Sequence, residues 1–183
     1  YKKNAILKKK GYIFYMNKQE SKEYEQFIEN NYMCNFTQSL KWNNIKTFWQ
    51  NSQIIIKKNN EIKLAANILI RKIPFFGTLM YVPRGPIGNI TDIELLTELT
   101  TKLKALAKEY KAFVILMEPD IDINNKEFLK IIKNLGYQVN SQSKNFNQEI
   151  QARHNLRLNL KNHSETEIFN NFSSKTRYNI RLA

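Results

Sequence analysis

Residues 36–46 combine aromatic and cationic side chains at helical spacing. Trp42 precedes Lys46 by four residues, so both side chains project from one face of a predicted helix. An ammonium group beside an aromatic ring can hold a phosphate or a carboxylate as a point charge. The alternative is that Trp42 and Trp49 belong to the core while Lys46 is solvated, and the spacing alone favours that alternative.

Residues 81–88, Tyr-Val-Pro-Arg-Gly-Pro-Ile-Gly, form a second candidate site between a predicted strand and a predicted helix. Loops in this position expose backbone N–H groups, and the start of the following helix carries partial positive charge. Arg84 adds a guanidinium group that can bind a phosphate or a carboxylate through two parallel hydrogen bonds. A rigid proline-rich turn is an equally weighted alternative.

Residues 172–183 predict a basic helix. Ser173 or Ser174 is expected to cap its first turn, and Arg177 and Arg181 fall four residues apart on one face. The sequence stops inside this helix, so we expect a fragment whose last segment faces an anion or leads into a further region. A solvated amphipathic helix is again an equally weighted alternative.

No nucleophile and base stand together in the sequence. His154 and His163 are interpreted as ordinary histidines. Residues 118–120, Glu-Pro-Asp, are interpreted as a polar turn at the end of a strand, with a general base there left open. Two His and one Cys cannot make a structural zinc site, and the single Cys34 cannot form an internal disulfide. A reducing, cytoplasmic compartment and no metal are therefore expected.

The composition is strongly basic, with 29 Lys and Arg against 16 Asp and Glu and a formal net charge of +13. Such a field attracts phosphates, whether in nucleic acid, in nucleotide-linked substrates or on an anionic membrane surface. The alternative is an AT-biased genome that encodes much lysine and asparagine, which would give the same excess of positive charge without any anionic partner. At 183 residues and 42% hydrophobic content the chain can bury one sizeable core, and no apolar run is long enough to span a bilayer.

The elements that must position these segments are two helices, then antiparallel strands, then strand–helix units. Helices are predicted at 21–31, 39–49, 91–110, 124–135 and from 164, and strands at 12–16, 54–56, 62–70, 77–82, 113–117, 138–139 and 156–160, with a loop at 83–88. Capping boxes are expected at Thr91 with Glu94 and at Ser164 with Glu167. The apolar run at 113–117 predicts a strand covered on both faces. This order indicates an α/β (α+β) fold with a mixed central sheet flanked by helices, as in GNAT-type N-acyltransferases.

Together these segments resemble the FemABX family of aminoacyltransferases, tRNA-dependent enzymes that build peptidoglycan interpeptide bridges. The resemblance covers about residues 20–183 and rests on five motifs in the same order and at similar spacing. The matching residues are Phe36, Gln38, Ser39, Trp42 and Lys46; Tyr81, Pro83, Arg84, Gly85 and Pro86; Glu118 and Pro119; Leu135, Gly136 and Tyr137; and Ser174, Lys175, Thr176, Arg177, Asn179, Ile180, Arg181 and Ala183.

The resemblance implies two packed GNAT-like domains, the first at residues 1–172. Residues 173–183 would begin the basic helix that leads to a second domain. The implied reaction moves an aminoacyl group from aminoacyl-tRNA to an amine on the stem peptide of UDP-MurNAc-pentapeptide or of a lipid-linked precursor. No cofactor is expected, and a peripheral contact with the inner membrane surface is left open. The catalytic side chain is expected in the second domain, so the fragment alone is predicted to be inactive.

The resemblance gives a specific role to Lys46, which would contact the phosphate-containing part of the precursor. Tyr81 and Arg84 match a family motif, and phosphate chemistry suggests that they line the precursor groove. Residues 175–181 match a segment near which the family handles RNA and precursor phosphates. The predicted substrate-binding residues are Trp42, Lys46, Tyr81, Arg84, Gly85, Lys175, Arg177 and Arg181.

Three other functions stay open. An acetyl-CoA-dependent N-acetyltransferase would carry its pyrophosphate loop at residues 84–88, but the usual Gln/Arg-x-x-Gly-x-Gly/Ala pattern is absent there and Pro86 removes one N–H group. A non-catalytic RNA-binding module would show salt-dependent RNA affinity, but the sequence has no RRM or KH signature. A degenerate first domain that serves as a scaffold would keep the fold and bind no precursor.

Overall fold

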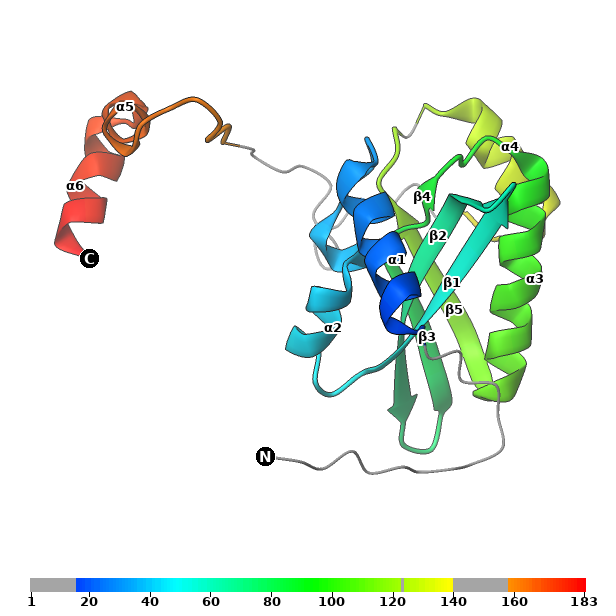
Figure 1. Cartoon of the computed structure of the whole chain (residues 1–183). Helices are drawn as coiled ribbons and strands as arrows, with labels where there is room; N and C mark the ends of the chain where they lie inside the picture. The colour runs from blue at the N-terminus through cyan, green and yellow to red at the C-terminus, as the bar shows by residue number, and fades with distance from the viewer. Residues whose placement is uncertain (1–15, 123, 140–157) are drawn as a thin grey trace. The chain divides into compact units, whose positions relative to one another are not determined.

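The computed structural model describes residues 16–122, 124–139 and 158–183. The chain divides into two compact units, residues 1–143 and 144–183, whose elements are labelled in Figure 1. The predicted strand at 12–16 lies outside the described residues except for Met16, as do residues 156 and 157 of the predicted strand at 156–160. The first domain over residues 1–172 and the second domain beyond it stay predictions.

The described part of the first unit is built on a five-stranded mixed sheet (Figure 1). The strands are β1 (Gln50–Lys58), β2 (Glu61–Ile73), β3 (Gly77–Arg84), β4 (Ile87–Gly88) and β5 (Ala112–Pro119). Their order is β1, β2, β3, β5, and the short β4 also pairs with β2. Neighbours among β1, β2 and β3 are antiparallel, whereas β3 and β5 are parallel. The predicted α/β fold class with a mixed central sheet is confirmed.

The predicted hairpin between β1 and β2 is also confirmed. Asn59 and Asn60 form its two-residue turn, with φ angles of 53° and 62°. Asparagine adopts the left-handed region more readily than most residues that carry a side chain, and two such residues in succession match the twist of the adjoining strands. The Asn-rich turn signal therefore located this connection correctly.

The predicted loop at residues 83–88 is wrong over most of its length. β3 continues through Pro83 and Arg84, which pair with Glu118 and Pro119 of β5, and β4 returns to pair with β2. Only residues 85 and 86 lie between the two strands. Prolines suggested a loop, but the parallel neighbour β5 supplies partners as far as Arg84, so the sheet extends to that point.

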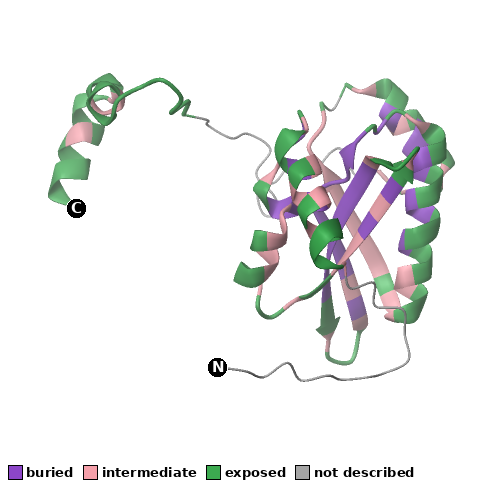
Figure 2. Ribbon diagram, viewed as in Figure 1, coloured by how far each residue is buried: buried purple, intermediate pink, exposed green. Residues whose placement is uncertain are grey.

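β2 lies at the centre of the core. All residues from 64 to 70 are buried, and because successive residues of a strand point to opposite faces, both faces of β2 are covered (Figure 2). α1 (Lys18–Asn30) contacts β2, and α3 (Ile93–Glu109) contacts β1, β2 and β5. α1 buries Tyr24 and Ile28. α3 buries the apolar stripe Leu95, Leu96, Leu99 and Leu103.

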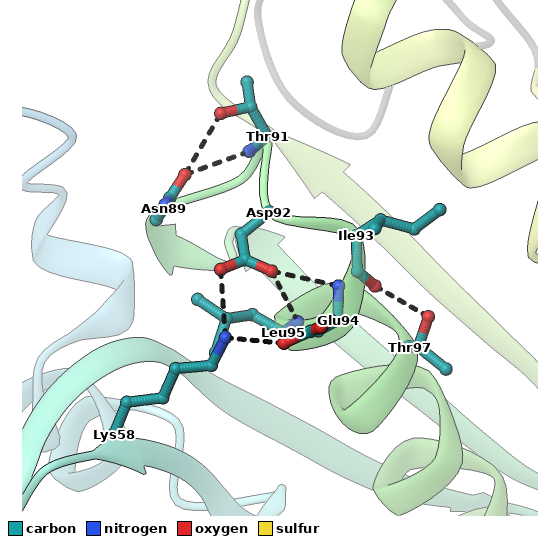
Figure 3. Close-up of polar contacts among 8 residues, drawn as sticks. All are labelled: Lys58, Asn89, Thr91, Asp92, Ile93, Glu94, Leu95 and Thr97. Carbon is teal, nitrogen blue, oxygen red and sulfur yellow. Dashed lines mark hydrogen bonds and ion pairs between the residues drawn. The ribbon is translucent and has the colours of Figure 1, made fainter.

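α3 begins with a different cap from the predicted one. Thr91 was expected to cap it, but Asp92 is the N-cap residue (Figure 3). Its Oδ1 accepts the backbone N–H groups of Glu94 at 2.9 Å and Leu95 at 3.1 Å. The Thr91 hydroxyl instead donates to Oδ1 of Asn89. A carboxylate is the stronger acceptor at the positive end of a helix, and the hydrogen bond from Leu95 is the main cause that lowers the pKa of Asp92.

The other helices of the first unit are short. The 3₁₀ turn η1 (Phe36–Gln38) precedes α2 (Leu40–Ile45), and α4 (Lys126–Asn134) follows β5. Asn125 caps α4, and Gly136, with φ 87°, follows its end as predicted. Residues 138 and 139 form no strand. No helix among the described residues is long and apolar enough to cross a membrane.

α2 is shorter than the helix predicted at residues 39–49. Lys46 ends it with non-helical backbone angles, φ −87° and ψ 54°. Trp49 lies beyond the helix, just before β1, and its ring faces the guanidinium group of Arg71 on β2 at 5.5 Å. Helical spacing did not predict the position of Trp49, because this residue lies in the connection between α2 and β1 and its ring contacts Arg71 of the sheet.

β5 exists where it was predicted, but it is not covered on both faces. Most of its residues are half-buried, and Phe113 is 56% exposed. β5 ends the described sheet, beyond β3. A continuous apolar run therefore overstated the burial of this strand, because an edge position exposes side chains that a central strand would bury.

The second unit contains α5 (Glu165–Asn171) and α6 (Ser174–Leu182). The capping box of Ser164 with Glu167 is confirmed, and Ser173 caps α6 as one of the two predicted candidates. The predicted half-buried strand is wrong over its described residues 158–160. Leu158 and Leu160 are 56% and 63% exposed and belong to no strand.

Candidate functional site

A side-chain amide fills a gap in the sheet between β2 and β3. The two strands pair as far as Leu69, and β4 resumes the pairing with β2 at Ala65. In the gap, Oε1 of Gln38 accepts the backbone N–H of Asn67 at 2.8 Å. Nε2 of Gln38 donates to the carbonyl groups of Asn67 at 3.3 Å and Pro83 at 2.5 Å. Gln38, which is 0% exposed, therefore supplies hydrogen bonds that a neighbouring strand would otherwise supply.

Gly85 lies directly against this amide. A Cβ atom at Gly85 would lie 2.7 Å from the carbon, nitrogen and oxygen of the Gln38 amide. That separation is too short for atoms that are not bonded, so a side chain here would displace Gln38. Gly85 was predicted to bind substrate, and the structure places it as the residue that leaves room for Gln38.

Asn67 connects the sheet to α2. Its side chain is fully buried within β2. Its Nδ2 donates to Oδ1 of Asn43 at 2.8 Å and to the carbonyl of Thr37 at 3.3 Å. Its Oδ1 accepts from Nδ2 of Asn43 at 3.2 Å and from Nε2 of Gln53 at 2.9 Å. Every polar group of this buried side chain therefore has a partner, and the two paired amides fix α2 against β2.

α2 is also held at its start. The backbone N–H of Leu40 donates to Oε1 of Glu25 at 2.5 Å, and Oγ of Ser39 accepts the N–H of Trp42 at 3.3 Å. Negative charge is favourable at the first turn of a helix. Since a helix of six residues is not stable alone, these contacts and Asn43 determine where its side chains lie.

Trp42 and Lys46 project from this fixed helix into one cluster. Nζ of Lys46 lies 4.7 Å from the centroid of the Trp42 ring, and Phe36 contacts the same ring edge-on at 5.1 Å between centroids. Nε1 of Trp42 is buried and has no hydrogen-bond partner among the described residues. A buried donor without a partner is costly, so this N–H group is suited to an acceptor on a ligand or on water.

A second polar cluster lies at the carboxyl ends of β3 and β5. Oη of Tyr81 donates to Oε2 of Glu118 at 2.5 Å. Nη1 of Arg84 lies 3.6 Å from Oδ1 of Asp120, and Nδ2 of Asn35 donates to Oδ2 of Asp120 at 3.5 Å. Parallel strands bring their carboxyl ends to one edge of a sheet, which is where open α/β sheets bind ligands. Tyr81 and Arg84 thus lie with two carboxylates at that edge.

The remaining predicted site residues lie in the second unit. Nη1 of Arg177 donates to the carbonyl groups of Asn170 at 3.0 Å and Phe172 at 2.5 Å, at the end of α5. The guanidinium group of Arg181 lies 5.1 Å from the Phe169 ring centroid. Both arginines therefore hold α5 and α6 together. Lys175 is exposed on α6.

Sequence reasoning missed the polar network beneath α2. Asn43, Gln53 and Asn67 were not singled out, nor was Thr37, whose hydroxyl donates to the Pro83 carbonyl at 3.0 Å. One signal was available. Asn67 interrupts the apolar run of residues 64–70, and a buried amide in a central strand requires partners.

The chain matches the family model described as the FemAB family over residues 19–183. It belongs to the FemAB family. Curated relatives in this family include the protein named lipid II:glycine glycyltransferase of Staphylococcus aureus (strain MRSA252), 27% identical, and that of Staphylococcus haemolyticus (strain JCSC1435), 28% identical. Each alignment spans 168 residues, which is 89% of this chain and 40% of the relative. The chain therefore spans about two fifths of the length of these relatives.

The solved structures include a FemAB-type relative with the same fold. The crystal structure of FemX is 28% identical with a TM-score of 0.60, over 63% of this chain and 30% of FemX. Both the fold class and the FemAB family were therefore predicted correctly from the sequence.

Proposed function

We propose that this chain contributes the acceptor-binding part of an aminoacyltransferase that acts on a lipid-linked peptidoglycan precursor. The observation that carries the proposal is the similarity to proteins named lipid II:glycine glycyltransferase over 89% of the chain. Lipid II and glycine are named only for the relatives. For this chain the acceptor, the amino acid and an aminoacyl-tRNA donor belong to the proposal.

The cluster of Trp42 and Lys46 supports an acceptor site. A precursor of this class carries phosphate groups, which an ammonium group can bind as a point charge. Lys46 lies 4.7 Å from the Trp42 ring centroid, and Nε1 of Trp42 offers a buried donor. The contacts of Asn43 and Ser39 hold α2 in place, so the two side chains are positioned before a ligand arrives.

The proposed reaction is aminolysis of an ester. The amine nitrogen of the acceptor attacks the ester carbonyl of the aminoacyl group, a C–N bond forms, and the C–O bond to the tRNA ribose breaks. The amine loses a proton and the ribose oxygen gains one. Rate enhancement requires a neutral amine, alignment of the reacting atoms and stabilisation of the oxyanion. We assign the charge-stabilising group to a second domain, so we expect this chain alone to bind acceptor without turnover.

Isothermal titration calorimetry tests the acceptor site. The chain is titrated with UDP-MurNAc-pentapeptide and with a short-chain, water-soluble lipid II analogue, and acetyl-CoA serves as the control ligand. Loss of one charge-assisted contact in Lys46→Ala should raise Kd about tenfold. Lys41→Ala is the matched control, because Lys41 is a highly exposed lysine of the same helix.

Binding of acetyl-CoA alone would contradict the proposal and favour an N-acetyltransferase. Equal weakening by Lys41→Ala and Lys46→Ala would show a general charge effect and would remove Lys46 from the site. If neither precursor form binds, the acceptor site is not in this chain.

A further inference from the structure

The β2–β3 hairpin ends in an exposed apolar tip. Phe75 is 105% exposed and Phe76 is 76% exposed, and Pro74 beside them is also exposed. Figure 1 shows this hairpin turn at the lower end of the sheet, where β2 and β3 meet. Two adjacent phenylalanines in such a position contribute little to the core, although phenylalanine is usually buried.

The backbone of this tip takes an unusual conformation at an aromatic residue. Phe75 has φ 67°, in the left-handed region, where a bulky residue is an outlier. Glycine, asparagine and aspartate are the usual residues in such turns. The same protein uses Asn59 and Asn60 for its β1–β2 turn. Folding alone would favour the same chemistry at Phe75, so contact with a partner molecule is the better explanation for the two phenylalanines.

Cationic side chains border the tip. Arg71 and Lys72 are exposed at the end of β2, and Lys111 is exposed just before β5. Around Gly77, the Lys111 carbonyl oxygen lies 3.4 Å, and a ring carbon of Phe113 3.5 Å, from where a Cβ atom would stand. None of these three cations forms an ion pair within the described part of the chain. We call Arg71, Lys72, Phe75, Phe76, Lys111 and Phe113 the tip patch.

Acidic residues are nearly absent from the segment that contains the tip. Between residues 30 and 91 the sequence has one acidic residue, Glu61, whose carboxylate pairs with Lys63. This segment includes α2, β1, β2 and β3. The hairpin and its flanking strands therefore suit an anionic partner, and exposed aromatic rings flanked by Lys and Arg are typical of proteins that lie on membranes.

We propose that the tip patch inserts into the interface of an anionic lipid bilayer, with the phenylalanines at the boundary between headgroups and acyl chains and the cations at the phosphates. This inference goes beyond the proposed function and does not depend on precursor binding. β3 has eight residues, so the cluster at Arg84 would stand about 25 Å from the tip, at roughly 3.3 Å per residue, and would remain in water.

Co-sedimentation with lipid vesicles tests the proposal. The 183-residue chain is mixed with vesicles of phosphatidylcholine containing about 30 mol% phosphatidylglycerol, which supply an anionic surface, and with vesicles of phosphatidylcholine alone. We expect binding to the anionic vesicles that weakens as salt is raised, because screening reduces attraction at the surface. Phe75→Ser with Phe76→Ser should lower the partition coefficient about tenfold or more.

Two charge variants make a matched pair. Lys72→Gln with Lys111→Gln removes two cations from the tip patch, whereas Lys126→Gln with Lys130→Gln removes two exposed cations from α4. The first pair should weaken binding about tenfold, and the second should change it by no more than about twofold. An equal loss of vesicle binding in the two double variants would overturn the proposal, because the attraction to lipid would then come from the net charge and not from the tip patch.

A second measurement locates the contact even if the serine variant unfolds. An environment-sensitive dye is attached to Phe76→Cys in a Cys34→Ser background, and to the exposed Cys34 of the unaltered chain. Anionic vesicles should shift the emission of the dye at position 76 to shorter wavelength and leave the dye at Cys34 unchanged. A chain that stays in the supernatant, or a dye at position 76 that does not respond, overturns the proposal and leaves the tip as a protein contact.

Discussion

At the carboxyl end of β3, Tyr81 and Arg84 lie against carboxylates, and Gln38 joins β3 to β2. At the amino end of the same strand, the hairpin presents Phe75 and Phe76 to solvent. Buried polar groups need partners with defined geometry, so the first end is rigid and specific. Exposed apolar groups lower their free energy in any apolar surroundings, so the second end suits a partner without a fixed shape, such as a lipid bilayer. Residues at the first end therefore fix the structure, whereas Phe75 and Phe76 at the second end contribute little to the core.

The largest expected effect is at the buried network. Asn67→Ala should lower the free energy of unfolding by about 3 kcal/mol, because Asn43, Gln53 and the Thr37 carbonyl all lose a partner. Urea denaturation followed by circular dichroism measures the change. Asn44→Ala is the control, since Asn44 is an exposed asparagine on α2, next to the Asn43 that pairs with Asn67. A similar small loss in both variants would show that the network does not stabilise this end.

A smaller effect is expected at Gly85. Gly85→Ala should cost about 2 kcal/mol, because the new methyl group would lie 2.7 Å from the Gln38 amide. A double-mutant cycle identifies the contact. In a Gln38→Ala background the same Gly85→Ala change should cost less than about 1 kcal/mol. Equal costs in the two backgrounds would mean that Gly85 is required for a reason other than space for Gln38.

The smallest effect is expected at the tip. Phe75→Gly should change the free energy of unfolding by no more than about 0.5 kcal/mol, because relief of the left-handed backbone offsets the flexibility of glycine. The control is Phe128→Ala, at a phenylalanine that is 1% exposed, which should cost about 3 kcal/mol. Thermal and urea unfolding measure both. A large loss at Phe75 would show that the tip belongs to the core after all.

Local signals in the sequence were sufficient for most of the fold. Apolar runs located β2, β3 and β5, and the pair Asn59 and Asn60 located the first hairpin. Errors arose where tertiary contacts decided between two acceptable local choices. Asp92 and Thr91 can both cap a helix, and Trp49 fits a helical stripe as well as a contact with the sheet.

The candidate site was predictable only in part. The four-residue spacing of Trp42 and Lys46 predicted one shared helix face, but spacing alone favoured a solvated Lys46, and the structure places its Nζ 4.7 Å from the Trp42 ring centroid. The network was not predictable, because the pairing of Asn43 with Asn67 joins residues 24 positions apart and depends on the packing of α2 against β2. The position of Arg84 near Asp120 likewise depends on the parallel pairing of β3 with β5, which sequence patterns do not specify.

The Gln38 amide that fills the gap between β2 and β3 also bears on how the protein folds. The β2–β3 hairpin forms between residues that are close in sequence. The gap between the two strands is instead filled by Gln38, which is 29 positions from Asn67 and 45 from Pro83. Contacts at such separation form slowly, because the intervening chain must lose entropy before they are made. The β2–β3 hairpin is therefore expected to form before the η1 segment brings Gln38 into the gap between the two strands.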